Sequence, residues 1–308
     1  MPISSLAQTQ QIIQQLGALQ TRGSDLQQQI TTGLKSQSYA GLAPQAAQLV
    51  SLAATQSQQQ GYIDTINTVN TRLQTMSLAT STMATLVQQF GSTLESNAYN
   101  TTGNTVQTQA KSLLAQMGDY LNTQDGEGYV FSGAETATAP YDASGLPNPG
   151  DLVTPVNVAP PSGYYAGDST VNQAQVDQGL NVQYGVTGDN PAFEQAIRAL
   201  NFIANSGSFN STNPADVANV NQAQQLLTTA ATQLQQVTAT IGMNQSNLNT
   251  ELTAHQNSLS LAKGTVGDIE NIDPAQVITQ LDALQTQLTA SYQTVSILQN
   301  LTLATYLK

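Results

Sequence analysis

Residues 213–263 read NPADVANVNQAQQLLTTAATQLQQVTATIGMNQSNLNTELTAHQNSLSLAK, and small or apolar side chains recur in this segment at steps of seven. Asn213 can cap a helix, and Pro214 can occupy its first turn. The heptad positions are Val220, Leu227, Leu234, Ile241, Leu248, His255 and Ala262, with Ala230, Val237, Leu252 and Leu259 between them. This seam predicts a helix of roughly 50 residues, about 75 Å long, that packs along another helix.

Further helices are predicted on the N-terminal side of this segment. Apolar residues spaced by three and four predict a second long helix over about residues 44–94, and the pattern continues after Gly103. Asn190 and Pro191 open a shorter helix that ends near residues 205–207. The apolar positions of these helices are Leu49, Leu52, Ile63, Ile66, Leu73, Met76, Met83, Val87, Phe90 and Leu94, then Val106, Ala110, Leu113, Leu114 and Met117, and finally Phe193, Ile197, Leu200 and Ile203. Together the segments predict an antiparallel bundle.

Both ends of the chain carry apolar seams of their own. The C-terminal seam follows a helix start at Asp273 and Pro274. Helices with so few charged flanking residues have little stability as isolated segments, so each requires a partner helix. The heptads also fit an intramolecular core, but for the two ends we predict packing between copies of the chain. The predicted assembly interface consists of Ile12, Leu16, Leu19, Leu26, Ile30, Leu281, Leu284, Leu288, Tyr292, Val295 and Leu298.

The middle of the chain differs in composition from the helical parts. Seven of the eleven prolines fall between Pro140 and Pro191, and no basic residue occurs from 112 to 197. Short strands are predicted at 129–131, 152–158 and 182–186. The predicted fold class is mainly α, a long antiparallel helical rod or bundle built from both chain ends, with a small β-rich inserted outer domain. The predicted segments are an N-terminal assembly helix at 1–40, the two halves of the rod at 41–128 and 190–263, the β-rich insert at 129–189, and a C-terminal assembly helix at 264–308.

Composition excludes several classes of function for this chain of 308 residues. Its formal net charge is −12 with only seven Lys and Arg, so neither a nucleic-acid surface nor a basic membrane anchor can be built. Cysteine is absent and His255 is the only histidine, so thiol chemistry, disulfides and multi-histidine metal sites are excluded. We predict no enzyme activity, no catalytic residue, no cofactor and no metal. The N-terminus has neither the basic segment nor the apolar segment of a general secretion signal.

A few polar residues have a functional and a structural interpretation. His255 lacks a second histidine or cysteine, so we predict a structural or interfacial role for it. Asp125 and Glu127 do not follow the spacing of a calcium loop, so a solvated turn is the favoured interpretation. Asp268, Glu270 and Asp273 precede Pro274, where carboxylates favour the start of a helix, so capping is the favoured role for them.

The two ends and the start of the insert resemble the bacterial flagellins and their hook-associated relatives. Residues 29–35, QITTGLK, are similar to the segment that closes the family's first helix, and residues 268–273, 288–293 and 301–307 are similar to its closing helix. The segment GYVFSG at 128–133, followed by TAPY at 138–141, resembles the entry to the outer domain of the hook-filament junction branch, also called hook-associated protein three. The motif residues are Tyr129, Phe131, Gly133, Pro140 and Tyr141. The sequence SYAGLAP at 38–44 departs from the usual flagellin pattern after the first helix.

This resemblance implies a structural subunit of the bacterial flagellum that joins hook to filament by helical self-packing of its terminal helices. The implied partners are copies of the chain itself, neighbouring hook-associated protein and flagellin subunits, and a cytoplasmic export chaperone. The implied location is extracellular, after export by the flagellar secretion apparatus without a cleaved signal peptide. A filament flagellin is the alternative within the family. A second alternative is an adhesion module, in which exposed tyrosines of the insert stack on sugars.

Overall fold

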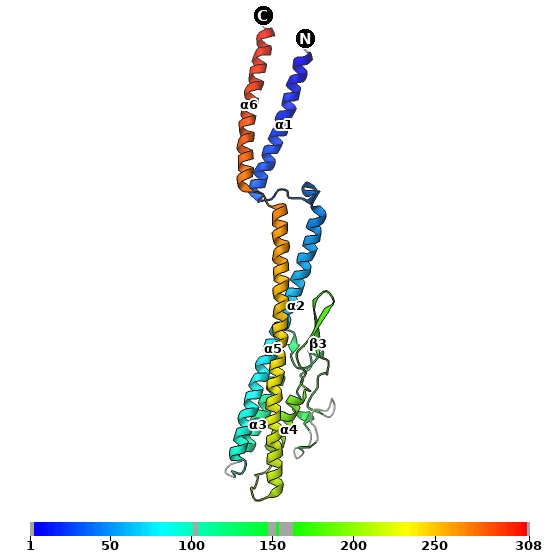
Figure 1. Ribbon diagram of the computed structural model, residues 1–308, viewed down its shortest axis with the longest axis vertical. Helices are drawn as coiled ribbons and strands as arrows, with labels where there is room; N and C mark the ends of the chain where they lie inside the picture. The colour runs from blue at the N-terminus through cyan, green and yellow to red at the C-terminus, as the bar shows by residue number, and fades with distance from the viewer. Residues whose placement is uncertain (1–2, 101–103, 147–151, 154–162, 307–308) are drawn as a thin grey trace. The chain divides into compact units, whose positions relative to one another are not determined.

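The computed structural model describes residues 3–100, 104–146, 152–153 and 163–306, and side chains are described within residues 10–297 of these ranges (Figure 1). The chain packs as two units, one formed by residues 1–58 with 258–308 and the other by residues 59–257. Long helices enter from both chain ends and small antiparallel sheets lie in the middle of the sequence, as predicted. Within the described part of the chain, no helix combines the length and the apolar character needed to cross a membrane.

The unit of residues 59–257 is built around the heptad helix. The helix α5 spans Pro214–Glu270, and every predicted heptad residue that it contributes to this unit, from Val220 to His255, is buried. The helix α2 spans Ala46–Asn97 and supplies a second row of buried side chains, from Ile66 to Leu94. The helices α3 (Thr105–Leu121) and α4 (Pro191–Asn205) pack against each other. One continuous hydrophobic core joins all four helices, which confirms the predicted bundle.

The short helix α4 shows how local sequence sets the ends of an element. The side chain of Asn190 accepts a hydrogen bond from the backbone N–H of Ala192 at 3.0 Å, and Pro191 occupies the first turn. Four apolar residues at spacings of three and four then point into the core with no exposed surface. They are Phe193, Ile197, Leu200 and Ile203. The predicted helix and its buried face are therefore confirmed.

The insert contains two hairpins among its described residues. Strands β1 (Gln124–Asp125) and β2 (Gly128–Tyr129) form one antiparallel pair, and β3 (Asn172–Asp177) and β4 (Leu180–Tyr184) form the other, which has an irregular register between Gln175 and Asp177. The predicted strand at 129–131 is wrong beyond Tyr129, because Val130 and Phe131 turn into the hydrophobic core instead. No strand forms at 152–153, and the predicted residues 156–158 lie outside the described part. The strand β3 was missed.

Candidate assembly interface

The terminal helices α1 (Ile3–Thr32) and α6 (Pro274–Tyr306) pair within one chain. Both chain ends lie at the same end of this antiparallel pair (Figure 1). Leu26, Val277 and Leu284 are buried between the helices. Gly23 lets them approach closely, because a Cβ at this position would stand 3.2 Å from the Leu284 side chain. Partly buried residues packed against this seam are Leu19, Ile272, Leu281 and Leu288.

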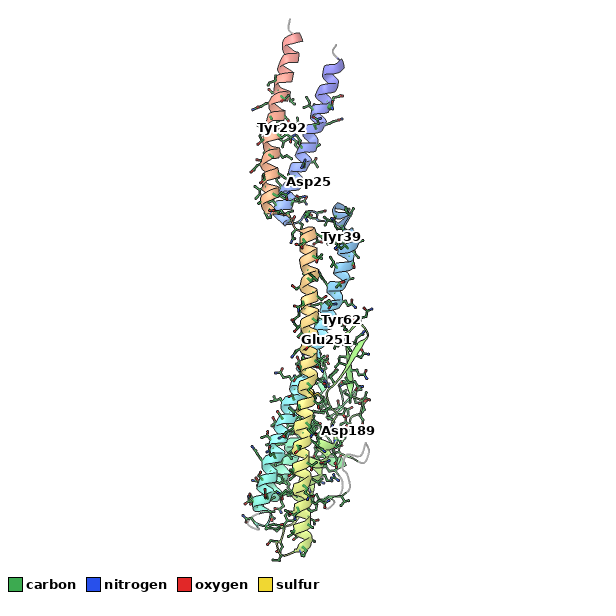
Figure 2. The ribbon with its side chains drawn as sticks, viewed as in Figure 1. Asp25, Tyr39, Tyr62, Asp189, Glu251 and Tyr292 are labelled. Atoms are coloured by element: carbon green, nitrogen blue, oxygen red, sulfur yellow. The ribbon has the colours of Figure 1, made fainter. Side chains whose placement is uncertain are left out.

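Polar contacts fix the register of the terminal pair at both of its described ends. Toward the chain ends, where Figure 2 labels Tyr292 on α6, the Gln20 side chain donates to the Tyr292 hydroxyl at 2.6 Å. At the other end, Gly33 adopts a φ of +74°, which favours glycine, and stops α1. The Ile272 N–H donates to the Gly33 carbonyl at 3.0 Å, and the Lys35 N–H donates to the Glu270 carbonyl at 2.7 Å. The pair is therefore held in one register by the chain itself.

Lys35 also binds the end of α5. Its Nζ donates to the carbonyl oxygens of Asp268 and Ile269, each at 2.8 Å. A cation at the C-terminal end of a helix satisfies free carbonyls and complements the helix dipole. The predicted capping role is thus wrong for Asp268 and Glu270, because α5 extends through both residues and they stand in its last turn. Asp273 does cap α6, since its Oδ1 accepts from the N–H of Ala275 at 3.0 Å.

The predicted interface residues do not share one environment. Six of them, Leu16, Leu19, Leu26, Leu281, Leu284 and Leu288, are buried or partly buried in the folded chain. Ile12 and Val295 are partly buried, Ile30 and Tyr292 are exposed, and the side chain of Leu298 lies outside the described part. A residue buried in the pair is not presented to another copy while the pair is closed. The use of these residues between copies stays a prediction.

Three exposed isoleucines were missed on the same two helices. Ile13 of α1 is 55% exposed, and Ile278 and Ile297 of α6 are 48% and 60% exposed. Only three charged residues, Arg22, Asp25 and Asp282, occur in α1 and α6. We call Ile13, Ile278 and Ile297 the outer isoleucines. They leave apolar side chains accessible on helices that carry little charge.

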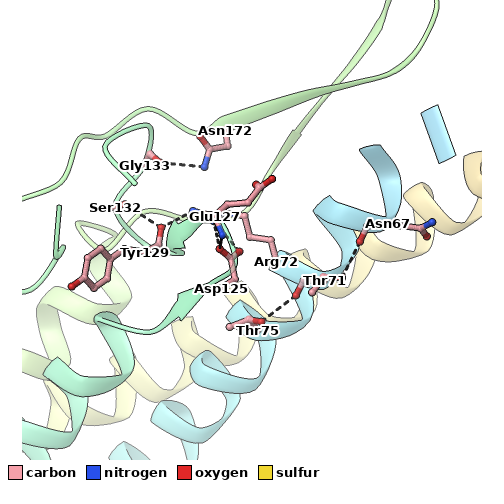
Figure 3. A network of polar contacts seen from close by, with 10 residues as sticks. All are labelled: Asn67, Thr71, Arg72, Thr75, Asp125, Glu127, Tyr129, Ser132, Gly133 and Asn172. Atoms are coloured by element: carbon pink, nitrogen blue, oxygen red, sulfur yellow. Dashed lines mark hydrogen bonds and ion pairs between the residues drawn. The ribbon is translucent and has the colours of Figure 1, made fainter. Parts of the chain in front are cut away.

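The motif at the start of the insert is fixed to α2 by an ion pair (Figure 3). Nη1 of Arg72 donates to both carboxylate oxygens of Asp125, at 3.0 and 2.9 Å, and Nη2 donates to the Tyr129 carbonyl at 2.6 Å. The side chains of Arg72 and Asp125 are only 3% and 7% exposed. The predicted solvated turn is therefore wrong for Asp125, whose carboxylate is buried and paired.

The rest of this motif enters the core. Phe131 is fully buried, with its ring centroid 5.5 Å from that of Phe193 in an edge-to-face arrangement. Gly133 has a φ of +69°, and a Cβ there would collide with Asp168. The Asp168 carboxylate accepts from the N–H of Ala134 at 2.8 Å, so this turn has no space for a side chain. Pro140 is buried as well.

The tyrosines of the insert are structural rather than exposed. Tyr164 and Tyr165 are buried, and Tyr164 donates its hydroxyl hydrogen to the Gly188 carbonyl at 2.6 Å. Tyr141, partly buried, bridges to Tyr165 through its backbone. Burial, and then the charges of Asp142 and Asp119, raise the pKa of Tyr141 to about 12. Burial likewise holds the pKa of Tyr164 and Tyr165 well above the ordinary value. The exposed tyrosines expected for an adhesion module are therefore not found at 164 and 165.

Comparison with known proteins gives a family match for one part of this chain and a similar fold for a larger part. Residues 215–307 match the family model of the bacterial flagellin C-terminal helical region. A putative flagellar hook-associated protein from Vibrio parahaemolyticus has a similar fold, with a TM-score of 0.59 and 18% identity, over 75% of this chain and 100% of that chain. FlgL from Bacillus cereus gives a TM-score of 0.42 and 15% identity, over 70% of this chain and 99% of that chain. No curated protein matches the sequence significantly.

Proposed function

We propose that this chain is a structural subunit of the flagellum that joins hook to filament, because residues 215–307 match the family model of the bacterial flagellin C-terminal helical region. The single observation that carries the proposal is the terminal pair of α1 and α6, a two-helix element with a buried inner seam and exposed isoleucines on both helices. An element of this kind can pack beside copies of itself in a helical array.

The energetics of the terminal pair favour assembly over independent stability. Among the described side chains of α1 and α6, four apolar ones are buried: Leu16, Leu26, Val277 and Leu284. Each contributes roughly 1.5–3 kcal/mol, so the described part of the inner seam is small. Burial of the outer isoleucines against a neighbouring copy adds apolar area of the same kind. Assembly thus supplies stabilisation that the isolated pair lacks.

The proposed partners follow from this role. They are copies of the chain, neighbouring hook-associated protein and flagellin subunits, and a cytoplasmic chaperone that holds the terminal segments before export. The proposed location is outside the cell, reached through the flagellar secretion apparatus without a cleaved signal peptide. The role is structural, not catalytic.

A filament flagellin is the second candidate, because the matched C-terminal region is the one described for flagellins. The two roles differ in the length of the assembled object. A flagellin polymerises without a fixed limit, whereas a junction subunit stops at a short ring or stays monomeric. The adhesion role is less well supported, because Tyr164 and Tyr165 are buried in the hydrophobic core.

The test combines two electron-microscopy observations. The purified chain is imaged in negative stain beside a form that lacks residues 1–40 and 264–308, and flagella are imaged from a strain without the gene. The junction role predicts no long filaments from the purified chain and bare hooks on the deletion strain. Long filaments from the intact chain alone would assign it as flagellin instead.

A further inference from the structure

A polar cluster lies where the β3–β4 hairpin meets α5, inside the unit of residues 59–257. A carboxylate oxygen of Asp177 on β3, one of Glu251 on α5 and a ring nitrogen of His255 on α5 all lie within 4.8 Å of one another. Glu251 and His255 are four residues apart, so they share one face of the helix. His255 is only 5% exposed, whereas both acids are partly exposed. The cluster therefore has a buried end and a side that solvent reaches.

Two oxygen atoms fix the imidazole ring of His255. Nε2 lies 2.7 Å from the Val176 carbonyl oxygen, and Nδ1 lies 2.5 Å from Oε1 of Gln59 on α2. A carbonyl oxygen only accepts, so Nε2 is the nitrogen that carries the proton. A neutral imidazole has one N–H, which leaves Nδ1 with a lone pair directed at the Gln59 oxygen. Nδ1 is therefore the ring nitrogen that can donate a lone pair to a cation.

These groups have the composition of a metal-binding set. A ring N–H held by a backbone carbonyl is the usual arrangement of a metal-binding histidine, because it fixes the tautomer and the orientation of the ring. The two carboxylates balance the charge of a divalent ion. A mixed set of one nitrogen and several oxygens suits Zn²⁺ and similar ions, whereas Ca²⁺ and Mg²⁺ prefer oxygen ligands alone.

We propose that Asp177, Glu251 and His255 bind one divalent transition-metal ion of the Zn²⁺ class. The ion ties the β3–β4 hairpin to α5. Since these residues come together only in the folded chain, the ion stabilises the folded state alone. The proposal is independent of the flagellar role, because it concerns the isolated chain.

The test uses the full-length chain, first freed of metal by a chelator and then titrated with ZnCl₂ near neutral pH. Calorimetry measures binding, and thermal unfolding followed by circular dichroism measures stability. We expect one Zn²⁺ per chain and a Tm raised by about 5 °C at saturation. Co²⁺ serves as a spectroscopic probe, because its visible absorption reports nitrogen and oxygen coordination.

Conservative variants separate the ligands from general charge effects. Glu251→Gln and Asp177→Asn should each weaken Zn²⁺ binding at least about tenfold while the fold, checked by circular dichroism, is kept. The matched control is Glu95→Gln, which removes an exposed carboxylate of α2 and should leave the affinity unchanged. His255→Gln should abolish the Co²⁺ absorption.

Several results would overturn the proposal. One is failure of the chain to bind Zn²⁺ or Co²⁺. Another is an equal affinity for Zn²⁺ in Glu251→Gln and Glu95→Gln. A third is binding of Ca²⁺ with an affinity that His255→Gln does not change. A Tm that follows pH but not Zn²⁺ would also overturn it. That result would assign the contact at Nδ1 to a bound proton or to a Gln59 amide turned to donate.

Discussion

Replacing Arg72 by Met tests whether a buried ion pair holds the insert on α2. Met retains much of the aliphatic volume but removes every donor, so the Asp125 carboxylate keeps only its 2.8 Å hydrogen bond from the Glu127 N–H. The Tyr129 carbonyl loses its Arg72 donor at the same time. Removing one partner of a buried pair costs about 3–5 kcal/mol, because a charge is left without compensation. For a unit of this size the Tm should fall by roughly 6–20 °C.

The assay is thermal and guanidinium unfolding followed by circular dichroism and tyrosine fluorescence. The matched control is Lys111→Met, which removes an exposed cation from α3 and should change stability by less than about 0.5 kcal/mol. The double variant Arg72→Met with Asp125→Leu should cost less than the sum of its single variants, because it leaves no buried charge. A loss from Arg72→Met no larger than that of the control, or strict additivity in the double variant, would refute the reasoning.

Three further outcomes follow from the packing. In a denaturant titration, Gly133→Ala should destabilise the chain by at least about 2 kcal/mol, because this position has a positive φ and a Cβ there collides with Asp168. Gly126→Ala is the control and should be nearly neutral, since a Cβ there meets nothing within 4 Å. Because burial raises the pKa of Tyr164, the unfolded chain releases this proton near pH 10 while the folded chain keeps it. The stabilisation from this tyrosine should be fully present below pH 10 and be lost above it, and a flat Tm from pH 9 to 12 would count against the burial. Leu284→Ala should cost about 2–5 kcal/mol in the terminal pair, seen as faster amide hydrogen exchange in α1 and α6, and unchanged exchange rates would argue that the pair is not closed in solution.

The helices could be predicted because their patterns are local. The steps of seven from Val220 to His255 describe one face of one helix, and the cap at Asn190 lies within its own turn. A pattern of this kind can be recognised without knowing which distant residues the helix contacts. For that reason the bundle, the start of α4 and the cap at Asp273 all follow from the sequence.

The sites could not be predicted because their partners are distant in sequence. Asp125 and Arg72 form an ion pair although they are 53 residues apart in the sequence. Nothing in the sequence around either residue indicates the other as its partner. The strand β3 was missed because only two of its six residues, Ala174 and Val176, are apolar, so its alternation is too short to distinguish it from a loop. On α6 apolar residues occur all round the helix, so the sequence does not separate the inner seam from exposed positions such as Ile278.

The most direct test of the central claim is electron microscopy of flagella from cells that carry Ile13→Ser and Ile278→Ser in the chromosomal gene. These changes spare the inner seam, so we expect normal export of the protein to the medium but bare hooks without filaments. The control is Met243→Ser, an exposed apolar residue of α5 that is 59% exposed, which should leave filaments intact. Normal filaments in cells with the two isoleucine changes would contradict assembly through the terminal helices.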